Sequence, residues 1–218
     1  MENPESMSRE METYYEERAP VYDRVYAYPE RQADLRGLEQ QVQTVFKGRV
    51  VLEVAAGTGY WSQFICRTAK HVLATDVNEG PLKEMKERDL QGSVETLVAD
   101  AYTLAEVEGE FDAGFAGCWF SHIAMADREA WLRAFHVKLK PGARVFLLDN
   151  SEAQTARLPI IDTDDDGNTY QARTTDSGET YRVIKNFPAA EEMMALVTDR
   201  DAVFTMMDHY WSFEYTLV

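Results

Sequence analysis

The spacing of hydrophobic and polar residues divides the chain into two parts. Over residues 10–46, apolar and aromatic side chains recur every three or four positions, which is typical of helices. Pro20 and Pro29 interrupt this spacing and predict two or three short helices rather than one long helix. We therefore expect residues 1–48 to form a unit of short helices.

After this unit, short apolar runs alternate with helical patterns and glycine-containing turns. Near-continuous apolar strands that alternate with helices are typical of a parallel sheet covered by helices on both faces. The sequence therefore predicts an α/β fold of this kind. The predicted strands are residues 50–54, 71–75, 94–98, 111–116 and 143–148.

The regular alternation then gives way to a polar stretch. Residues 151–188 contain turn signals that predict a hairpin of strands at 170–173 and 181–184. We interpret this stretch as an insertion into the α/β domain. A helix and two further strands are predicted at residues 190–197, 202–206 and 210–217.

Small residues and one acid mark the end of the first predicted strand. Glu53 precedes a turn that contains Ala55, Gly57 and Gly59 and leads into a helix. Such a turn lets the backbone approach a ligand, and the helix start offers free amide groups. Alanine at position 55 still permits this approach unless a positive φ is required. A carboxylate at Glu53 favours a cationic or zwitterionic ligand over a pyrophosphate, although Glu53 could equally bond turn amides.

Two aspartates follow the next two predicted strands. Asp76 ends the second strand and Asp100 ends the third. Parallel strands present their carboxyl ends at one edge of a sheet, which is where such sheets bind ligands. A carboxylate at Asp76 can accept hydrogen bonds from two vicinal hydroxyls, and one at Asp100 from an adenine amino group. Either aspartate could instead cap a helix or form a turn.

This series of motifs resembles the class I S-adenosylmethionine-dependent methyltransferases over roughly residues 49–150. The turn at residues 53–59 is similar to the family's first motif, with Ala55 where glycine is commoner. The resemblance implies S-adenosylmethionine as the cofactor, with its ribose hydroxyls on Asp76. The implied cofactor-binding residues are Tyr14, Arg18, Tyr22, Glu53, Ala55, Gly57, Gly59, Asp76, Val77, Asp100, Ala101 and Cys118.

The resemblance also implies the complete architecture. We expect a Rossmann-like, doubly wound α/β fold with a mostly parallel seven-stranded sheet, an antiparallel last strand and an N-terminal helical cap. Residues 1–48 would be the cap, and residues 49–218 the methyltransferase domain, with an insertion at about 151–188 that shapes the acceptor pocket. Arg18 or a tyrosine hydroxyl of the cap could meet the cofactor's carboxylate, although packing of an amphipathic helix would explain the same residues.

Candidate catalytic residues lie beyond the fourth and fifth predicted strands. His122 is the candidate general base, because its unperturbed pKa is near neutrality. Asp149 and Asn150 are candidates for orienting the acceptor. His122 could instead cap or pack against the following helix, and Asp149 and Asn150 could satisfy turn amides.

The net charge and the cysteine content limit the classes of partner and the cellular location that we expect. The chain has 38 acidic and 22 basic side chains and a formal net charge of −16, which argues against nucleic acid or an anionic membrane as partner. The same charge favours a neutral or cationic small-molecule acceptor through the field at the cleft. Cys66 and Cys118 are too few for a disulfide framework, and the polar start does not resemble a signal peptide, so we expect a cytoplasmic protein. The oligomeric state stays open.

No metal site is predicted. Residues 162–167 match the first half of a calcium loop, but the twelfth position, which should be glutamate, is Arg173. A solvated acidic hairpin explains the same residues.

The sequence therefore predicts methyl transfer from S-adenosylmethionine to a small-molecule nucleophile by in-line displacement. A cyclase or lyase that consumes S-adenosylmethionine without an acceptor is one alternative. An NAD-dependent oxidoreductase is another, disfavoured by Glu53 and by Ser62, where the dinucleotide fingerprint has glycine. A catalytically silent cofactor-binding protein is a third.

Overall fold

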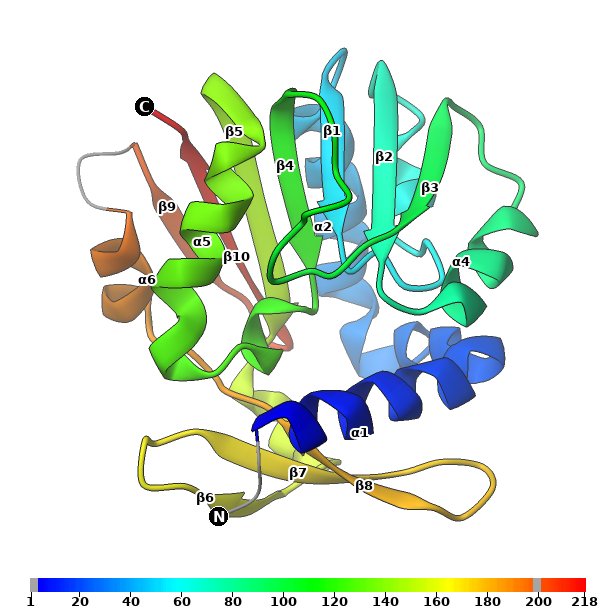
Figure 1. Cartoon of the computed structure of the whole chain (residues 1–218), viewed down its shortest axis with the longest axis vertical. Helices are drawn as coiled ribbons and strands as arrows, with labels where there is room; N and C mark the ends of the chain where they lie inside the picture. Colours follow the sequence, from blue (N-terminus) through cyan, green and yellow to red (C-terminus); the bar gives the residue numbers. More distant parts are fainter. Residues whose placement is uncertain (1–3, 198–200) are drawn as a thin grey trace.

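A seven-stranded sheet forms the centre of the computed structural model, which describes residues 4–197 and 201–218 (Figure 1). Its strand order is β3-β2-β1-β4-β5-β10-β9. The strands β1 to β5 pair in parallel, whereas β10 is antiparallel to both β5 and β9. The strands are β1 (Val50–Val54), β2 (His71–Asp76), β3 (Val94–Val98), β4 (Phe111–Gly117), β5 (Leu139–Asn150), β9 (Val203–Met206) and β10 (Tyr210–Thr216). The predicted mostly parallel sheet with an antiparallel last strand is confirmed.

Helices cover both faces of this sheet. The helices α2 (Gln32–Val45), α3 (Ser62–Ile65) and α4 (Glu79–Lys86) pack on one face, where Val51 and Phe115 of the sheet contribute to a buried core. The helices α5 (Arg128–Val137) and α6 (Ala190–Leu196) pack on the other face in a second core. This burial on both faces explains why the central strands are apolar almost throughout.

The fifth strand begins earlier than the sequence predicts. Leu139 already pairs with Phe111, and the register shifts before the next pair, Ala113 with Arg144. Gly142 adopts a φ of 82°, so the chain crosses this irregularity without strain at a side chain. Pro141 and Gly142 therefore lie in an irregular part of β5, at a bulge, rather than in a turn before the strand.

The N-terminal segment forms short helices, as predicted. α1 (Pro4–Arg18) is followed by the 3₁₀ helices η1 (Ala19–Tyr26) and η2 (Pro29–Arg31), and each of these has a proline in its first turn. α1 lies across the carboxyl edge of the sheet (Figure 1). α1 therefore lies near the strand ends that carry Glu53 and Asp76.

The polar insertion forms a small sheet of its own. β6 (Ile160–Thr163), β7 (Thr169–Thr174) and β8 (Thr180–Ile184) pair antiparallel in the order β6-β7-β8. The predicted hairpin is β7 with β8, and β6 is an additional strand. This sheet lies beyond α1, which packs against β8 (Figure 1). Three further 3₁₀ helices are η3 (Phe120–His122), η4 (Met125–Asp127) and η5 (Glu152–Ala156).

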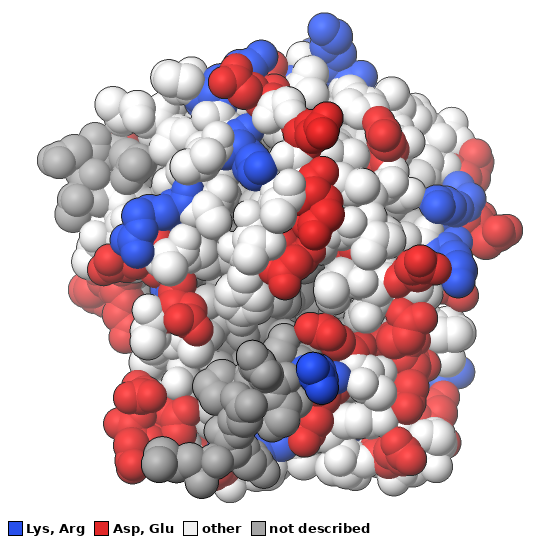
Figure 2. Space-filling view, in the orientation of Figure 1, with Lys and Arg blue, Asp and Glu red and all other residues white. Residues whose placement is uncertain are grey.

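The surface is predominantly acidic. Figure 2 shows acidic side chains spread over the visible face, with fewer basic ones among them. Among the described residues, no helix is long and apolar enough to cross a membrane.

Candidate active site

The turn after β1 holds three residues in the left-handed backbone region. Gly57 and Gly59 have φ values of 56° and 77°, and Ala55 has a φ of 52°. Glycine adopts this region freely, whereas alanine does so at a cost of about 1–2 kcal/mol. Ala55 therefore has the positive φ at which alanine is less favourable than glycine. This strained turn brings backbone amides to the edge of a large cavity.

The cavity lies at the carboxyl edge of β1, β2 and β4 and has a volume of about 970 Å³. It is closed partly by α1 and η1, whose Met11, Tyr15 and Tyr22 line it. The predicted cofactor-binding residues that line it are Tyr22, Glu53, Ala55, Gly57, Asp76, Val77, Asp100, Ala101 and Cys118.

Three of the predicted cofactor-binding residues do not line this cavity. Tyr14 is buried against Met11 and Val183, and its hydroxyl accepts a hydrogen bond of 2.8 Å from Arg18 Nη1. Both Tyr14 and Arg18 line a second, smaller cavity instead. A Cβ at Gly59 would lie 2.5 Å from Met85 Cγ, so this glycine permits close packing of the turn on α4.

Glu53 lies deeply buried at the cavity wall. Its exposed fraction is 1%, and its Oε2 atom accepts a hydrogen bond of 2.7 Å from the Ser62 hydroxyl. Burial raises the pKa of this carboxyl to about 8, although the Ser62 hydrogen bond opposes the shift. The partner of Glu53 is thus a hydroxyl rather than the turn amides. A cation in the cavity would favour the ionised carboxylate.

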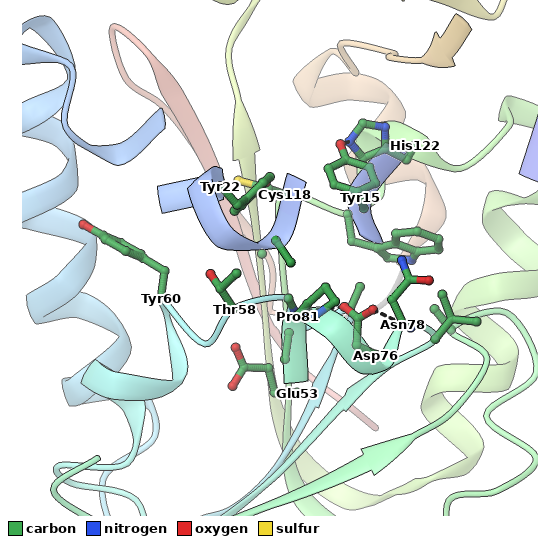
Figure 3. A pocket seen from close by; sticks show the side chains of 18 of the residues that line it. Tyr15, Tyr22, Glu53, Thr58, Tyr60, Asp76, Asn78, Pro81, Cys118 and His122 are labelled. Carbon is green, nitrogen blue, oxygen red and sulfur yellow. Dashed lines mark hydrogen bonds between the residues drawn. The ribbon is translucent and has the colours of Figure 1, made fainter. Parts of the chain in front are cut away.

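Asp76 is fixed between the turn and α4 by two backbone groups. Its Oδ2 accepts the N–H of Gly57 and its Oδ1 that of Asn78, each at 2.9 Å (Figure 3). Burial raises the pKa of the Asp76 carboxyl to about 6, and these two N–H donors limit the rise. A carboxylate has about four acceptor positions, so Asp76 keeps acceptor capacity for a ligand in the cavity.

Asp100 has a turn-forming role as well as a place on the cavity wall. Its Oδ1 accepts the backbone N–H groups of Tyr102 at 2.7 Å and Thr103 at 3.0 Å. Tyr102 in turn packs edge-to-face against Trp119, with ring centroids 5.4 Å apart. The turn therefore holds an aromatic wall at this end of the cavity.

His122 does not present a free nitrogen to the cavity. Its Nδ1 lies 2.6 Å from the Ile184 carbonyl oxygen, which can only accept, so Nδ1 carries the proton. Nε2 then accepts a hydrogen bond of 2.9 Å from the Tyr15 hydroxyl, and the two side chains lie together in Figure 3. Burial and, to a smaller extent, the nearby Lys185 ammonium lower the pKa of His122 to about 3. His122 is therefore neutral and can act on a ligand only through Tyr15.

Asp149 lies behind the cavities in a buried ion pair. Its carboxylate accepts hydrogen bonds from Lys185 Nζ at 2.7 Å and from the backbone N–H of Ser121 at 3.0 Å. Burial acts to raise the pKa of the Asp149 carboxyl, but Lys185 outweighs it and holds the pKa below its usual value. Asp149 lines neither cavity, so its place is to hold Lys185. Asn150, by contrast, lines the second cavity.

The second cavity adjoins the first and has a volume of about 400 Å³. The residues that line both cavities are Tyr15, Tyr22, Tyr26, Cys118 and His122. Of the described residues, four cationic ones line the second cavity: Arg18, Arg31, Arg173 and Lys185. Only Arg18 among these is a candidate from the sequence. The others come from three separate segments, and no local motif marks them.

A family model described as a methyltransferase domain matches residues 51–142, which run from β1 into β5. Over these residues the α/β domain is therefore similar to methyltransferase domains. The ubiquinone/menaquinone biosynthesis C-methyltransferase UbiE of Escherichia coli O1:K1 / APEC is 33% identical over 126 residues, covering 54% of this chain and 47% of that protein. The chain thus spans about half the length of the curated relatives that it matches.

Several solved structures share the fold over nearly the whole chain. The structure described as a DhpI-SAH complex superimposes with a TM-score of 0.80 at 22% identity and covers 98% of both chains. A DhpI-SAM-HEP complex gives a TM-score of 0.82 at 23% identity, over 98% of this chain and 99% of that one. The CcbJ methyltransferase from Streptomyces caelestis gives 0.67 at 18% identity, over 94% and 98%. The similarity in fold therefore includes the N-terminal helices and the small sheet of the insertion.

Proposed function

We propose that this methyltransferase domain transfers the methyl group of S-adenosylmethionine to a small molecule bound in the second cavity. The observation that carries this proposal is the pair of adjoining cavities, which meet at Tyr15, Cys118 and His122. The larger cavity has the strand-end acids of a cofactor site, and the smaller one has space for an acceptor. In this proposal, residues 1–48 act as a cap over the domain formed by residues 49–218.

The larger cavity fits S-adenosylmethionine by the chemistry of its lining. Asp76 retains acceptor positions for ribose hydroxyls, and Val77 and Ala101 offer apolar contacts to a flat base. Glu53 would stabilise the positive charge that the cofactor carries, because an ionised carboxylate in a buried site interacts strongly with a cation. The bound cofactor supplies an electrophilic methyl group on a sulfonium.

The proteins described as DhpI bind SAM and SAH, and UbiE is a C-methyltransferase; both descriptions agree with this assignment. We also propose a cytoplasmic location, because Cys66 and Cys118 are free thiols and a reducing compartment keeps them so.

The chain's own residues would act mainly by positioning. In-line displacement needs the acceptor atom opposite the bond that breaks, with water excluded. Tyr15, Tyr22 and Tyr26 form much of the wall where the cavities meet, and they fit the task of excluding water. His122 is a positioning residue here, because it holds the Tyr15 hydroxyl by a hydrogen bond and is itself uncharged.

A cyclase or lyase would use the cofactor alone and would have no need for the second cavity. The presence of that cavity favours a transferase with an external acceptor. An NAD-dependent reaction would place a pyrophosphate near the buried carboxyl of Glu53, which an anion would make harder to ionise.

Thermal-shift titration tests the proposal. S-adenosylhomocysteine at 100 times its Kd should stabilise the protein by about 2.7 kcal/mol, whereas NAD should leave the Tm unchanged. The Asp76→Asn variant should need a higher concentration of S-adenosylhomocysteine for the same shift. Stabilisation by NAD only would overturn the proposal. Turnover of S-adenosylmethionine in the absence of any acceptor would replace it with the cyclase or lyase.

A further inference from the structure

The second cavity is basic although the protein as a whole is acidic. Acidic side chains are spread over the surface in Figure 2, and the net charge is −16. The cationic residues Arg18, Arg31, Arg173 and Lys185 line the second cavity, and none of the described residues on its wall is aspartate or glutamate. The charge of the whole chain therefore does not describe the charge that a ligand meets in this cavity.

Arg173 is buried and has no acidic partner among the described residues. Its exposed fraction is 7%, and its Nη2 donates a hydrogen bond of 2.6 Å to the neutral Gln171 Oε1. Its Nε has no hydrogen-bond partner within the described part of the chain. No carboxylate of the described residues lies within 4.0 Å of its guanidinium. A buried charge without a counter-ion is strongly unfavourable, so an anion that bound beside Arg173 would be stabilised.

Arg31, from the N-terminal segment, is likewise buried and has no acidic partner among the described residues. Its exposed fraction is 5%, and its Nη1 donates to the Val25 carbonyl oxygen at 3.3 Å. Its guanidinium lies over the rings of Tyr28 and Tyr210, at 5.1 Å and 5.9 Å from their centroids. Within residues 4–197 and 201–218, no ion pair with a carboxylate involves Arg31. The rings hold the guanidinium in place but leave its charge uncompensated.

Lys185 adds charge to the cavity without offering free donors. Its Nζ donates to Asp149 Oδ1 at 2.7 Å, to Ser121 Oγ at 2.6 Å and to Asn150 Oδ1 at 3.3 Å, which uses all three protons. Arg31, Arg173 and Lys185 together carry three positive charges against the single negative charge of Asp149. The half-buried Arg18, which donates to the neutral Tyr14 hydroxyl, adds a further positive charge, so the excess of positive charge suits an anion that carries more than one negative charge.

We propose that the second cavity recognises the acceptor through a doubly charged oxoanion of the phosphate or phosphonate type, bound by Arg31 and Arg173. This inference rests on the proposed methyl transfer for the placement of the acceptor. The planar guanidinium groups suit an oxoanion, because each can donate two parallel hydrogen bonds to two of its oxygens. It replaces the neutral or cationic acceptor that the net charge favours.

The reason for the replacement is electrostatic. Exposed acids are screened by water and salt over about 8 Å at physiological ionic strength, whereas buried charges act on a ligand with little screening. The four cations on the wall of the cavity therefore dominate over the more numerous acids on the surface.

Isothermal titration of the full chain saturated with S-adenosylhomocysteine tests this inference. The probes are methylphosphonate, inorganic phosphate, acetate and tetramethylammonium, at mildly alkaline pH. Methylphosphonate and phosphate should bind, acetate should bind more weakly, and tetramethylammonium should not bind. Arg173→Gln and Arg31→Gln should each weaken methylphosphonate binding by about tenfold or more. Arg24→Gln is the matched control, because Arg24 is exposed and pairs with Asp176 at the surface.

Each outcome separates this inference from the proposed function. Binding of S-adenosylhomocysteine without binding of any anion would overturn the oxoanion while leaving methyl transfer in place, as would unchanged methylphosphonate affinity in both arginine variants. Binding of tetramethylammonium in place of the anions would restore a cationic acceptor. Failure of S-adenosylhomocysteine to bind would overturn the proposed function instead. Both arginine variants should retain the S-adenosylhomocysteine affinity of the wild type, which shows that they are folded.

Discussion

Glu53→Gln should stabilise the empty protein in a manner that depends on pH. The Glu53 carboxyl is 1% exposed, and burial raises its pKa from 4.5 to about 8. Because the pKa is higher in the folded state, the contribution of Glu53 to stability is fully present below about pH 4.5. It is lost as the pH rises toward 8. Glutamine keeps an oxygen for the Ser62 hydroxyl and has no proton to lose.

The size of the effect follows from the two pKa values. A pH of 7 lies about 2.5 units above the pKa of 4.5 that the Glu53 carboxyl has in the unfolded chain, so the carboxyl is ionised there. In the folded protein the same carboxyl is still mostly protonated at pH 7. At about 1.36 kcal/mol per unit, the wild type loses about 3 kcal/mol relative to its stability in acid. The glutamine variant avoids this loss. For a chain of this size, its Tm should exceed that of the wild type by roughly 6–12 °C at neutral pH.

Thermal unfolding of the cofactor-free protein at several pH values measures this difference. The Tm gap between variant and wild type should be small at about pH 4.5 and should widen toward pH 8. Glu110→Gln is the control, because Glu110 is exposed in a loop and should show no such widening. A gap that stays constant from acid to alkaline pH would show that the Glu53 carboxyl ionises normally, and the reasoning would be refuted.

Three further changes test the turn and the cavity. Asp76→Asn should weaken S-adenosylhomocysteine binding in calorimetry by about 10–100-fold, because an amide accepts hydrogen bonds less strongly than a carboxylate; unchanged affinity would remove Asp76 from the site. Gly59→Ala should cost about 2–4 kcal/mol in urea unfolding, and Gly57→Ala about 1–2 kcal/mol. Both positions have positive φ, but only at Gly59 would the new Cβ meet Met85, so equal losses would contradict the packing argument. Burial raises the pKa of the Cys118 thiol to about 12, so iodoacetamide at about pH 8 should modify it at least about a hundredfold more slowly than in urea; equal rates would contradict the burial.

Much of the lining of the larger cavity could be predicted from local sequence. The strand-end acids Glu53 and Asp76 line one cavity, as expected, because parallel strands bring their carboxyl ends to a common edge. The hydrogen-bond partners of these acids could not be predicted in the same way. Ser62 reaches Glu53 from the first turn of α3, and the Gly57 N–H reaches Asp76 from the neighbouring loop. The first contact depends on how α3 packs beside β1, and the second on the register between β1 and β2, neither of which local patterns specify.

The catalytic candidates show where local reasoning ends. The position of His122 after β4 correctly places it at the cavity, but its neutrality depends on burial and on Lys185, a residue of the insertion. The sequence predicts that Arg18 binds the cofactor, whereas Arg18 lines the second cavity, because α1 crosses the sheet edge at an angle that its own sequence does not define. Ala55 has a positive φ that only the folded turn reveals.

The sequence by itself determined the alternation of elements, the strand-end acids and the resemblance of the α/β domain to methyltransferases. These features are local, since a buried strand needs an apolar run and a ligand turn needs small residues. Only the tertiary structure decided the character of the second cavity. Arg31, Arg173 and Lys185 lie in the cap, in β7 and after β8, and folding brings them to one wall. The net charge could not indicate this, because a ligand responds to the charges buried around it rather than to the sum over the chain.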